Sequence, residues 1–256
     1  MAYRHDLVSV EALRTRIAAL EGLWQGGGRC QGAPAAVTLG LDALDRALPW
    51  SGLPVACLHE IAAAAAADGA ATGFAAILLA RLAAAEGERP RPVLWCAAGD
   101  GLYGPGLAGY GLDGRRLVLV RGRSDADLLW AMEESLRSGA VAAVLGEVHE
   151  ADLTASRRLQ LAAEAGRATA LLLRPAQAKT APSAAITAWK IAAAPTAPAP
   201  YGLGATRWRV MLARCRGGVP RQWLLEWNDE AHRLIVAAEL RDRPAYPHAG
   251  FGRVAV

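Results

Sequence analysis

Short apolar runs alternate with amphipathic segments along most of this chain. Short apolar runs are typical of buried strands, whereas apolar residues at spacings of three and four are typical of helices. Their alternation predicts an α/β fold, a mostly parallel sheet flanked by helices. The expected strands are 37–39, 55–61, 92–97, 117–120, 141–145, 168–173 and 186–192, and the expected helices are 41–48, 70–85, 126–138 and 154–165.

The pattern changes towards the C-terminus. Residues 207–215 and 222–227 alternate between apolar and polar side chains, and Gly217, Gly218 and Pro220 stand between them. This arrangement indicates a β-hairpin, and 232–239 is a candidate last strand. We therefore expect antiparallel strands at the C-terminal end of the sheet.

The two ends of the chain have a different character. In 1–25, Val10, Leu13, Ile17 and Leu20 form an apolar stripe on a short amphipathic helix. The Gly-rich stretch 26–36 follows as a linker, so the helix either folds back on its own domain or docks on another protein. Residues 37–240 form the core. The tail, 241–256, has no periodicity and includes Tyr246 and Phe251, which suggests a segment ordered by a partner.

Composition and charge exclude several classes of protein. Of 256 residues 53% are hydrophobic, yet no apolar run approaches the roughly 20 residues that a membrane helix needs. Four cysteines without C-x-x-C spacing suggest neither a disulfide framework nor a zinc site, and we expect no secretory signal, because residues 1–10 contain no apolar run. The net charge is only +4. The densest basic cluster of the chain is either a site for an anionic partner or a solvated loop. It consists of Arg115, Arg116, Arg121 and Arg123.

A loop of small residues follows the expected strand 55–61, in the place where a phosphate-binding loop belongs. Such a loop needs converging glycines and a Lys that meets the phosphates. No Lys occurs between residues 1 and 178, alanines line the loop, and Asp68 adds a negative charge. We expect no nucleotide hydrolysis and no cofactor from this degenerate loop, whose key positions are Ala62, Asp68, Gly69, Ala70 and Thr72.

Four segments of the chain resemble the RecA/Rad51 superfamily. The segments V-T-L-G-L-D-A-L-D (37–45), S-G-L-P (51–54) and L-H-E-I (58–61) resemble the opening of its core, and 133–148 looks like its Walker B helix and strand. The emptied loop, the short length and the Trp-containing C-terminal strands are similar to the ImuA family, and the SulA division inhibitors are a shorter relative. Glu147 then stands at the Walker B position and Asp100 near the catalytic Glu.

The resemblance implies a function and partners. It implies a catalytically inactive RecA-like adaptor in SOS-induced error-prone translesion DNA synthesis, located in the cytoplasm and at the nucleoid when in a complex. The implied partners are RecA and ImuB and, indirectly, an error-prone replicative-type DNA polymerase. Direct DNA binding is expected to be weak or absent. Whether the protein forms a homo-oligomer is left open. The alternatives are a divergent RecA-type ATPase and a SulA-like cell-division inhibitor.

The C-terminal strands combine tryptophan with arginine, residue types enriched at protein interfaces. Arg221, Trp223 and Trp227 are candidate docking residues on this hairpin, and the alternative is that the tryptophans pack the sheet against a helix. His149 lies between Glu147 and Glu150, a spacing that fits a surface loop better than a metal site. The partner-binding candidates are Val10, Leu13, Ile17, Leu20, Arg221, Trp223, Trp227, Tyr246 and Phe251.

Overall fold

The computed structural model describes residues 35–240 except 66–68, 87–89, 100, 177, 179–180 and 197–203, and it leaves out the side chains of 238–240. The predicted N-terminal helix and the tail 241–256 lie outside the described residues. So do Asp68 and Asp100.

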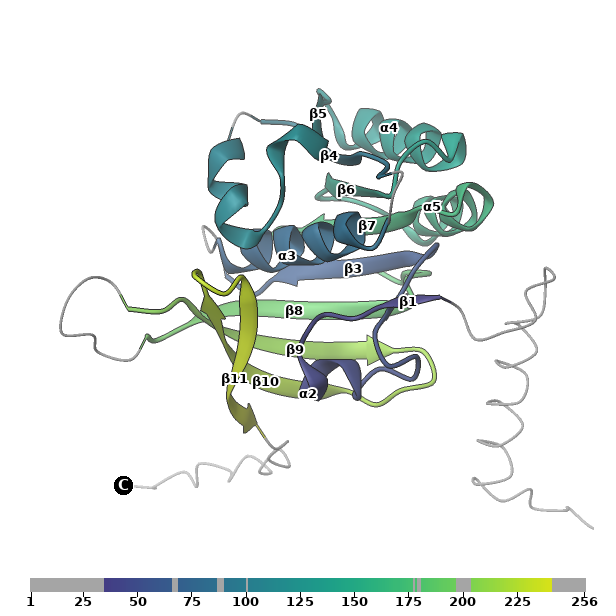
Figure 1. The fold of residues 1–256 in the computed structure, drawn as a ribbon. Coiled ribbons are helices and arrows are strands. Elements are labelled where there is room, and N and C mark those ends of the chain that lie inside the picture. Colours follow the sequence, from purple (N-terminus) through teal and green to yellow (C-terminus); the bar gives the residue numbers. More distant parts are fainter. Residues whose placement is uncertain are drawn as a thin grey trace, which may run out of the picture.

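The described chain forms one nine-stranded sheet (Figure 1), in the order β11-β10-β9-β8-β3-β7-β6-β4-β5. The six neighbouring strands β8, β3, β7, β6, β4 and β5 are parallel. Strands β8, β9, β10 and β11 pair antiparallel with one another in this order. This confirms the predicted architecture. The strands are β3 (Leu58–Ala63), β4 (Val93–Ala97), β5 (Leu117–Arg121), β6 (Ala143–Glu147), β7 (Thr169–Arg174), β8 (Thr187–Ala194), β9 (Arg207–Cys215), β10 (Arg221–Asn228) and β11 (Arg233–Leu240).

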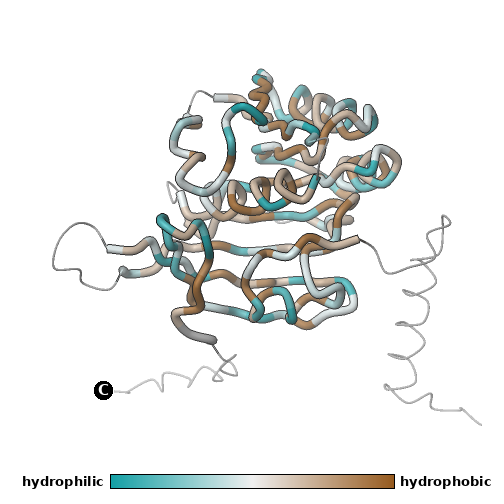
Figure 2. The backbone as a smooth tube through the Cα atoms, in the orientation of Figure 1, coloured by the Kyte–Doolittle hydropathy of each residue, from teal (hydrophilic) through white to brown (hydrophobic). Residues whose placement is uncertain are grey.

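Helices cover both faces of the parallel strands (Figure 1). On one face α3 (Ala70–Ala84) packs in a core that includes Trp95 and Trp189; on the other, α4 (Asp125–Ser138) and α5 (Leu153–Gly166) pack in a second core. Figure 2 shows hydrophobic stretches running through the sheet and the helices that pack on it. Among the described helices, none is long and apolar enough to cross a membrane.

Local sequence explains where α4 and α5 begin and how closely α4 lies on the sheet. The Ser124 side chain caps α4 by accepting a hydrogen bond from the Asp127 N–H at 3.2 Å, and Asp152 caps α5 through the Ala155 N–H at 2.7 Å. Gly146 lies under Met132, and a Cβ at this position would collide with the sulfur. The absence of a side chain at Gly146 therefore lets α4 approach β6.

Several elements differ from the predicted boundaries. The expected strand 55–61 is shifted, because Leu53–Pro54 forms β2 in a separate pair with β1 (Ala36–Val37) and the central strand begins only at Leu58. The expected helix 41–48 is shortened to α2 (Asp42–Asp45). The connection between β4 and β5 contains two short 3-10 helices that hydrophobic periodicity did not indicate, η1 (Gly104–Tyr110) and η2 (Gly114–Arg116).

Candidate functional site

The loop of small residues that we expected to be a degenerate phosphate loop follows the carboxyl end of the central strand β3. After β3 the chain stays next to β8, since the Ala64 N–H donates to the Ile191 carbonyl at 2.7 Å. Gly69 stands at the N-cap of α3 and offers no side-chain cap. Ala70 is buried and Thr72 is half-buried. The described part of the loop therefore presents methyl groups and a single hydroxyl.

Aromatic side chains pack against the beginning of α3. A Cβ built at Gly73 would lie 2.9 Å from both Trp208 Cζ2 and Tyr110 Cζ, so these rings lie directly on the helix backbone. The Tyr110 ring centroid lies 5.9 Å from that of Trp208 and 5.8 Å from that of Trp227. Trp227 Nε1 also donates to the Gly109 carbonyl at 3.1 Å. The cluster thus joins η1 to strands β9 and β10 across α3.

The Walker B-like carboxylate of Glu147 has a protein partner. Trp95 Nε1, on the adjacent strand β4, donates a hydrogen bond to Glu147 Oε1 at 2.6 Å. Trp95 is 1% exposed and belongs to the same core as α3. The carboxylate is therefore held by an indole on the face of the sheet where a phosphate-bound metal would be expected.

The resemblance to the RecA/Rad51 superfamily implies Mg-ATP, and the described residues do not fit it. A phosphate loop supplies a Lys and a Mg²⁺ that together neutralise the β and γ oxygens. The chain has no Lys before residue 179, and the Glu147 carboxylate is hydrogen-bonded to Trp95.

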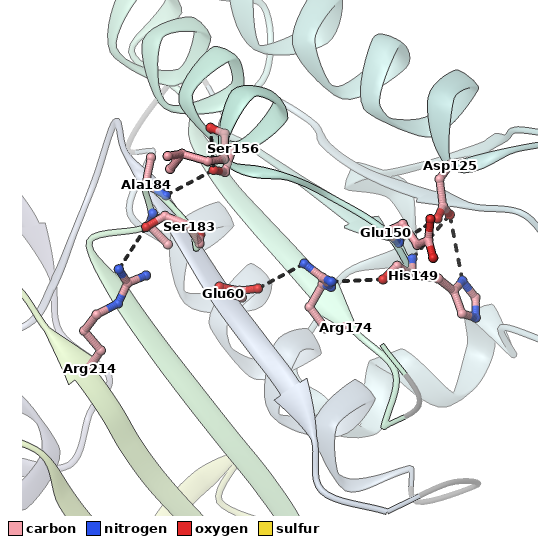
Figure 3. A network of polar contacts seen from close by, with 11 residues as sticks. Glu60, Asp125, His149, Glu150, Ser156, Arg174, Ser183, Ala184 and Arg214 are labelled. Atoms are coloured by element: carbon pink, nitrogen blue, oxygen red, sulfur yellow. Dashed lines mark hydrogen bonds and ion pairs between the residues drawn. The ribbon is translucent and has the colours of Figure 1, made fainter. Parts of the chain in front are cut away.

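A second polar group of residues lies at the same end of the strands, on the α4 and α5 side (Figure 3). Arg174 Nη1 lies 3.2 Å from Glu60 Oε1, and its Nη2 donates to the His149 carbonyl at 2.9 Å. The Asp125 carboxylate accepts hydrogen bonds from the backbone N–H groups of His149 and Glu150. These contacts fix the β6–α5 loop; within the described residues, no group of three His, Cys, Asp or Glu is placed to hold a metal.

Sequence reasoning did not find a buried polar chain around His59. Trp189 Nε1 donates to Thr187 Oγ1 at 2.8 Å, His59 Nδ1 lies 2.7 Å from Thr187 Oγ1, and His59 Nε2 lies 2.8 Å from the Pro54 carbonyl. Burial lowers the pKa of His59 to about 4, although the contact with Pro54 opposes this shift. The bonding pattern fits a neutral imidazole with its proton on Nε2.

Cys57 lies against this chain, with Sγ 3.4 Å from His59 Nε2. A Cys beside a His resembles a nucleophilic pair, but burial raises the pKa of the Cys57 thiol far above its usual range. A thiol that stays protonated is not a nucleophile. The position of His59 after a Pro-containing turn gave no sequence signal for any of these contacts.

No protein-family model matches the chain. Protein ImuA from two strains of Caulobacter vibrioides is 36% identical over 207 residues, which cover 77% of this chain and 85% of that protein. The chain belongs to the ImuA family. The cell division inhibitor SulA of Edwardsiella piscicida is 35% identical over 118 residues, covering 45% of this ImuA-family chain and 69% of that protein.

A solved structure supports the fold of this ImuA-family chain. A KaiC-like protein of Pyrococcus horikoshii OT3 superposes with a TM-score of 0.51 at 11% identity, over 80% of this chain and all of that one. At this identity the likeness concerns the fold alone. The chain thus has a RecA/KaiC-like α/β fold, as the sequence predicted.

The partner-binding candidates of this ImuA-family chain separate into three groups. Trp223 and Trp227 are each 2% exposed, so their assignment to a docking surface is wrong; they face inward because they alternate with the polar residues of β10. Arg221 is exposed at the start of β10. The others lie outside the described residues: Val10, Leu13, Ile17, Leu20, Tyr246 and Phe251.

Proposed function

We propose that this protein is an adaptor that does not hydrolyse nucleotide and that binds RecA and ImuB in SOS-induced error-prone translesion DNA synthesis. Through ImuB it brings in an error-prone replicative-type DNA polymerase indirectly. Membership of the ImuA family supports the cellular role. The absence of a Lys from the loop that follows β3 is the single observation that carries the loss of catalysis.

The chemistry of phosphoryl transfer supports the inactive site. In this reaction the protein contributes mainly positioning and electrostatic stabilisation, through a Lys, a Mg²⁺ and its carboxylate ligand. Here the Lys is missing from the sequence, and the carboxylate position is held by Trp95. The remaining use of the fold is recognition of other proteins.

A nucleotide titration tests the loss of catalysis. Millimolar Mg-ATP is expected to leave the melting temperature of the full chain unchanged, with no ATPase above background. A ligand at 100 times its Kd would add about 2.7 kcal/mol to stability. A saturable shift that disappears in Glu147→Ala contradicts the proposal and supports the divergent RecA-type ATPase.

A binding measurement tests the adaptor role. We expect the full chain to retain purified RecA and purified ImuB in pull-downs. Deletion of 241–256 is expected to weaken at least one complex about tenfold, or about 1.4 kcal/mol, because the tail lacks the periodicity of a self-contained element. Leu13→Asp with Ile17→Asp tests the N-terminal stripe. If the full chain retains neither protein, the adaptor role is wrong.

Arg221 is the exposed hairpin candidate, and it has a matched control on the next strand. Arg221→Ala is expected to weaken one of the two complexes, whereas Arg209→Ala, another exposed arginine of the antiparallel strands, is expected to leave both unchanged. Equal effects of the two substitutions would point to total charge instead of a docking contact.

Binding to single-stranded DNA is expected to be weak or absent by fluorescence anisotropy.

The similarity to SulA favours one second candidate, a cell-division inhibitor that binds the tubulin homologue. This candidate acts without ImuB. Expression in cells that lack ImuB separates the two proposals: filamentous cells support the inhibitor, and normal division supports the adaptor.

A further inference from the structure

Strand β5 forms one edge of the sheet and is unusually apolar for an edge (Figure 1). Its residues are Leu117, Val118, Leu119, Val120 and Arg121. Val118 is 45% exposed and Leu119 is 49% exposed, and adjacent strand residues point to opposite faces. In the described part of the chain only β4 pairs with β5. Both faces of this edge are therefore accessible to another protein.

The opposite edge has features that discourage pairing, and β5 lacks them. The β10–β11 register shifts between Leu224 and Leu225, and β11 begins with the exposed Arg233. Strand β5 has no Pro, no charge before Arg121, and an uninterrupted register with β4. Regular apolar edges without bulges or inward charges accept further strands readily, and native proteins normally protect them.

Exposed arginines flank the edge on both sides, and they belong to the basic cluster that was identified in the sequence. The Arg115 side chain is 91% exposed and ion-pairs with Asp113, and Arg121 and Arg123 are exposed. In an antiparallel pairing of two copies centred on Leu119, Arg115 of one copy stands opposite Arg123 of the other. Like charges directly opposite each other destabilise a strand pair. The charges favour an acidic partner over a second copy.

We infer that β5 is the docking edge for an extended apolar segment of a partner protein, with acidic residues on both sides of that segment. The segment adds a tenth strand to the described sheet through backbone hydrogen bonds. Its side chains contact Val118 on one face and Leu119 on the other, while its carboxylates meet the flanking arginines. This inference rests on the proposed adaptor function and names the surface by which the adaptor holds a partner.

Two labelled peptides test the edge without knowledge of the partner. Both have a core of alternating Val and Thr; one has two Asp at each end and the other has two Lys. Fluorescence anisotropy with the full chain is expected to give a Kd at least about tenfold lower for the Asp peptide. Arg115→Glu with Arg123→Glu is expected to reverse this preference. Arg46→Glu with Arg209→Glu, the same charge change at exposed positions away from β5, is expected to preserve it.

A substitution in the strand separates pairing from simple charge attraction. Leu119→Lys is expected to weaken binding of the Asp peptide at least about tenfold despite its added positive charge, because it removes an apolar contact. Leu161→Lys is the matched control, since Leu161 is 61% exposed but lies on α5. Val118→Thr removes an apolar contact while keeping the branched shape, and it is expected to weaken binding in the same direction. Melting temperatures confirm that each variant is folded.

Three results of the peptide measurements overturn the inference. They are equal binding of the two peptides, no binding to either, and unchanged binding in both Leu119→Lys and Val118→Thr. A dimer that dissociates on Leu119→Lys would show that a second copy occupies the edge, which also contradicts the acidic partner. Pull-downs with RecA and ImuB separate this failure from that of the adaptor role. If the full chain retains either protein but not the Asp peptide, the edge assignment alone is wrong; if it binds the peptide and neither protein, the adaptor role is wrong.

Discussion

Trp95 Nε1 donates a hydrogen bond to Glu147 Oε1 at 2.6 Å, between the neighbouring strands β4 and β6. A Walker B carboxylate normally serves a metal-bound phosphate. In this chain the carboxylate that we expected at this position accepts an indole N–H, and the two groups satisfy each other at the edge of the core. A retained acidic residue is therefore weak evidence for a retained reaction.

Substitution of each partner tests this contact. Trp95→Phe removes the donor and some core volume, so we expect it to lower the free energy of unfolding by about 2 to 4 kcal/mol. Glu147→Gln keeps an acceptor oxygen and is expected to cost less than about 1.5 kcal/mol, since a neutral acceptor forms a weaker bond. Urea denaturation measures both. A harmless Trp95→Phe would show that the contact contributes nothing to stability.

Two glycines at the beginning of α3 give a matched test of the aromatic packing on this helix. Gly73→Ala places a methyl group 2.9 Å from Trp208 and Tyr110, and overpacking of this kind costs about 1 to 3 kcal/mol. Gly69→Ala meets no atom within 4 Å and has an ordinary helical φ of −66°, so we expect a change within about 0.5 kcal/mol. Thermal unfolding compares the two. Equal melting temperatures would mean that the rings move aside from Gly73.

The sheet was predictable because its strands carry local signals. The apolar run at 141–145 is the length and composition of a buried parallel strand, and Gly217, Gly218 and Pro220 mark the hairpin between β9 and β10. Strand β2 was not predicted, and the expected strand 55–61 began before β3 does, because Leu53–Pro54 pairs with residues 36–37, a contact that periodicity does not encode. The segments η1 and η2 were missed for a related reason: η1 is held from outside by Trp227.

The site was only partly predictable. The missing Lys was read directly from the sequence, but the partner of Glu147 lies 52 positions away on another strand. Trp223 and Trp227 were candidates for a docking surface because residue type suggests interfaces, with packing of the sheet as the alternative. Strand alternation places Gln222 and Leu224 on the other face, and the structure has both tryptophans inside. Contacts between distant strands decide these points, and one sequence does not show them.

A buried carboxylate joins the two helices on the second face of the sheet. Glu133, 4% exposed on α4, lies 2.6 Å from Arg137 and 2.5 Å from Arg158 of α5. Glu133→Gln is expected to cost about 1 to 3 kcal/mol, less than a fully buried pair because both arginines are more than half exposed to solvent. Glu134→Gln is the control. Its carboxylate is 54% exposed and 3.9 Å from Arg137, so its effect is expected to stay below about 0.5 kcal/mol in urea denaturation.

Stability is expected to depend on pH through His59. The pKa of His59 is about 4 in the folded protein against 6.5 without the surrounding structure. The unfolded chain therefore binds the proton more tightly, so stability is full above pH 6.5 and falls as the pH drops from 6.5 towards 4. The whole window is worth about 3 kcal/mol, at 1.36 kcal/mol for each pKa unit, and about 2 kcal/mol of this is lost between pH 7.5 and pH 5.

Comparison of variants isolates this contribution from that of the carboxylates, which titrate in a similar range. His59→Asn is expected to be less stable than the natural chain at pH 7.5, because it breaks the chain from Trp189 through Thr187 to Pro54. Its loss between pH 7.5 and pH 5 is expected to be smaller by about 2 kcal/mol, since Asn carries no titrating proton. His149→Asn, at a side chain that is 64% exposed, is expected to keep the dependence of the natural chain. Urea denaturation at the two pH values measures the free energy of unfolding of each variant. If His59→Asn loses as much of it between pH 7.5 and pH 5 as the natural chain does, His59 is protonated in the folded protein at pH 5.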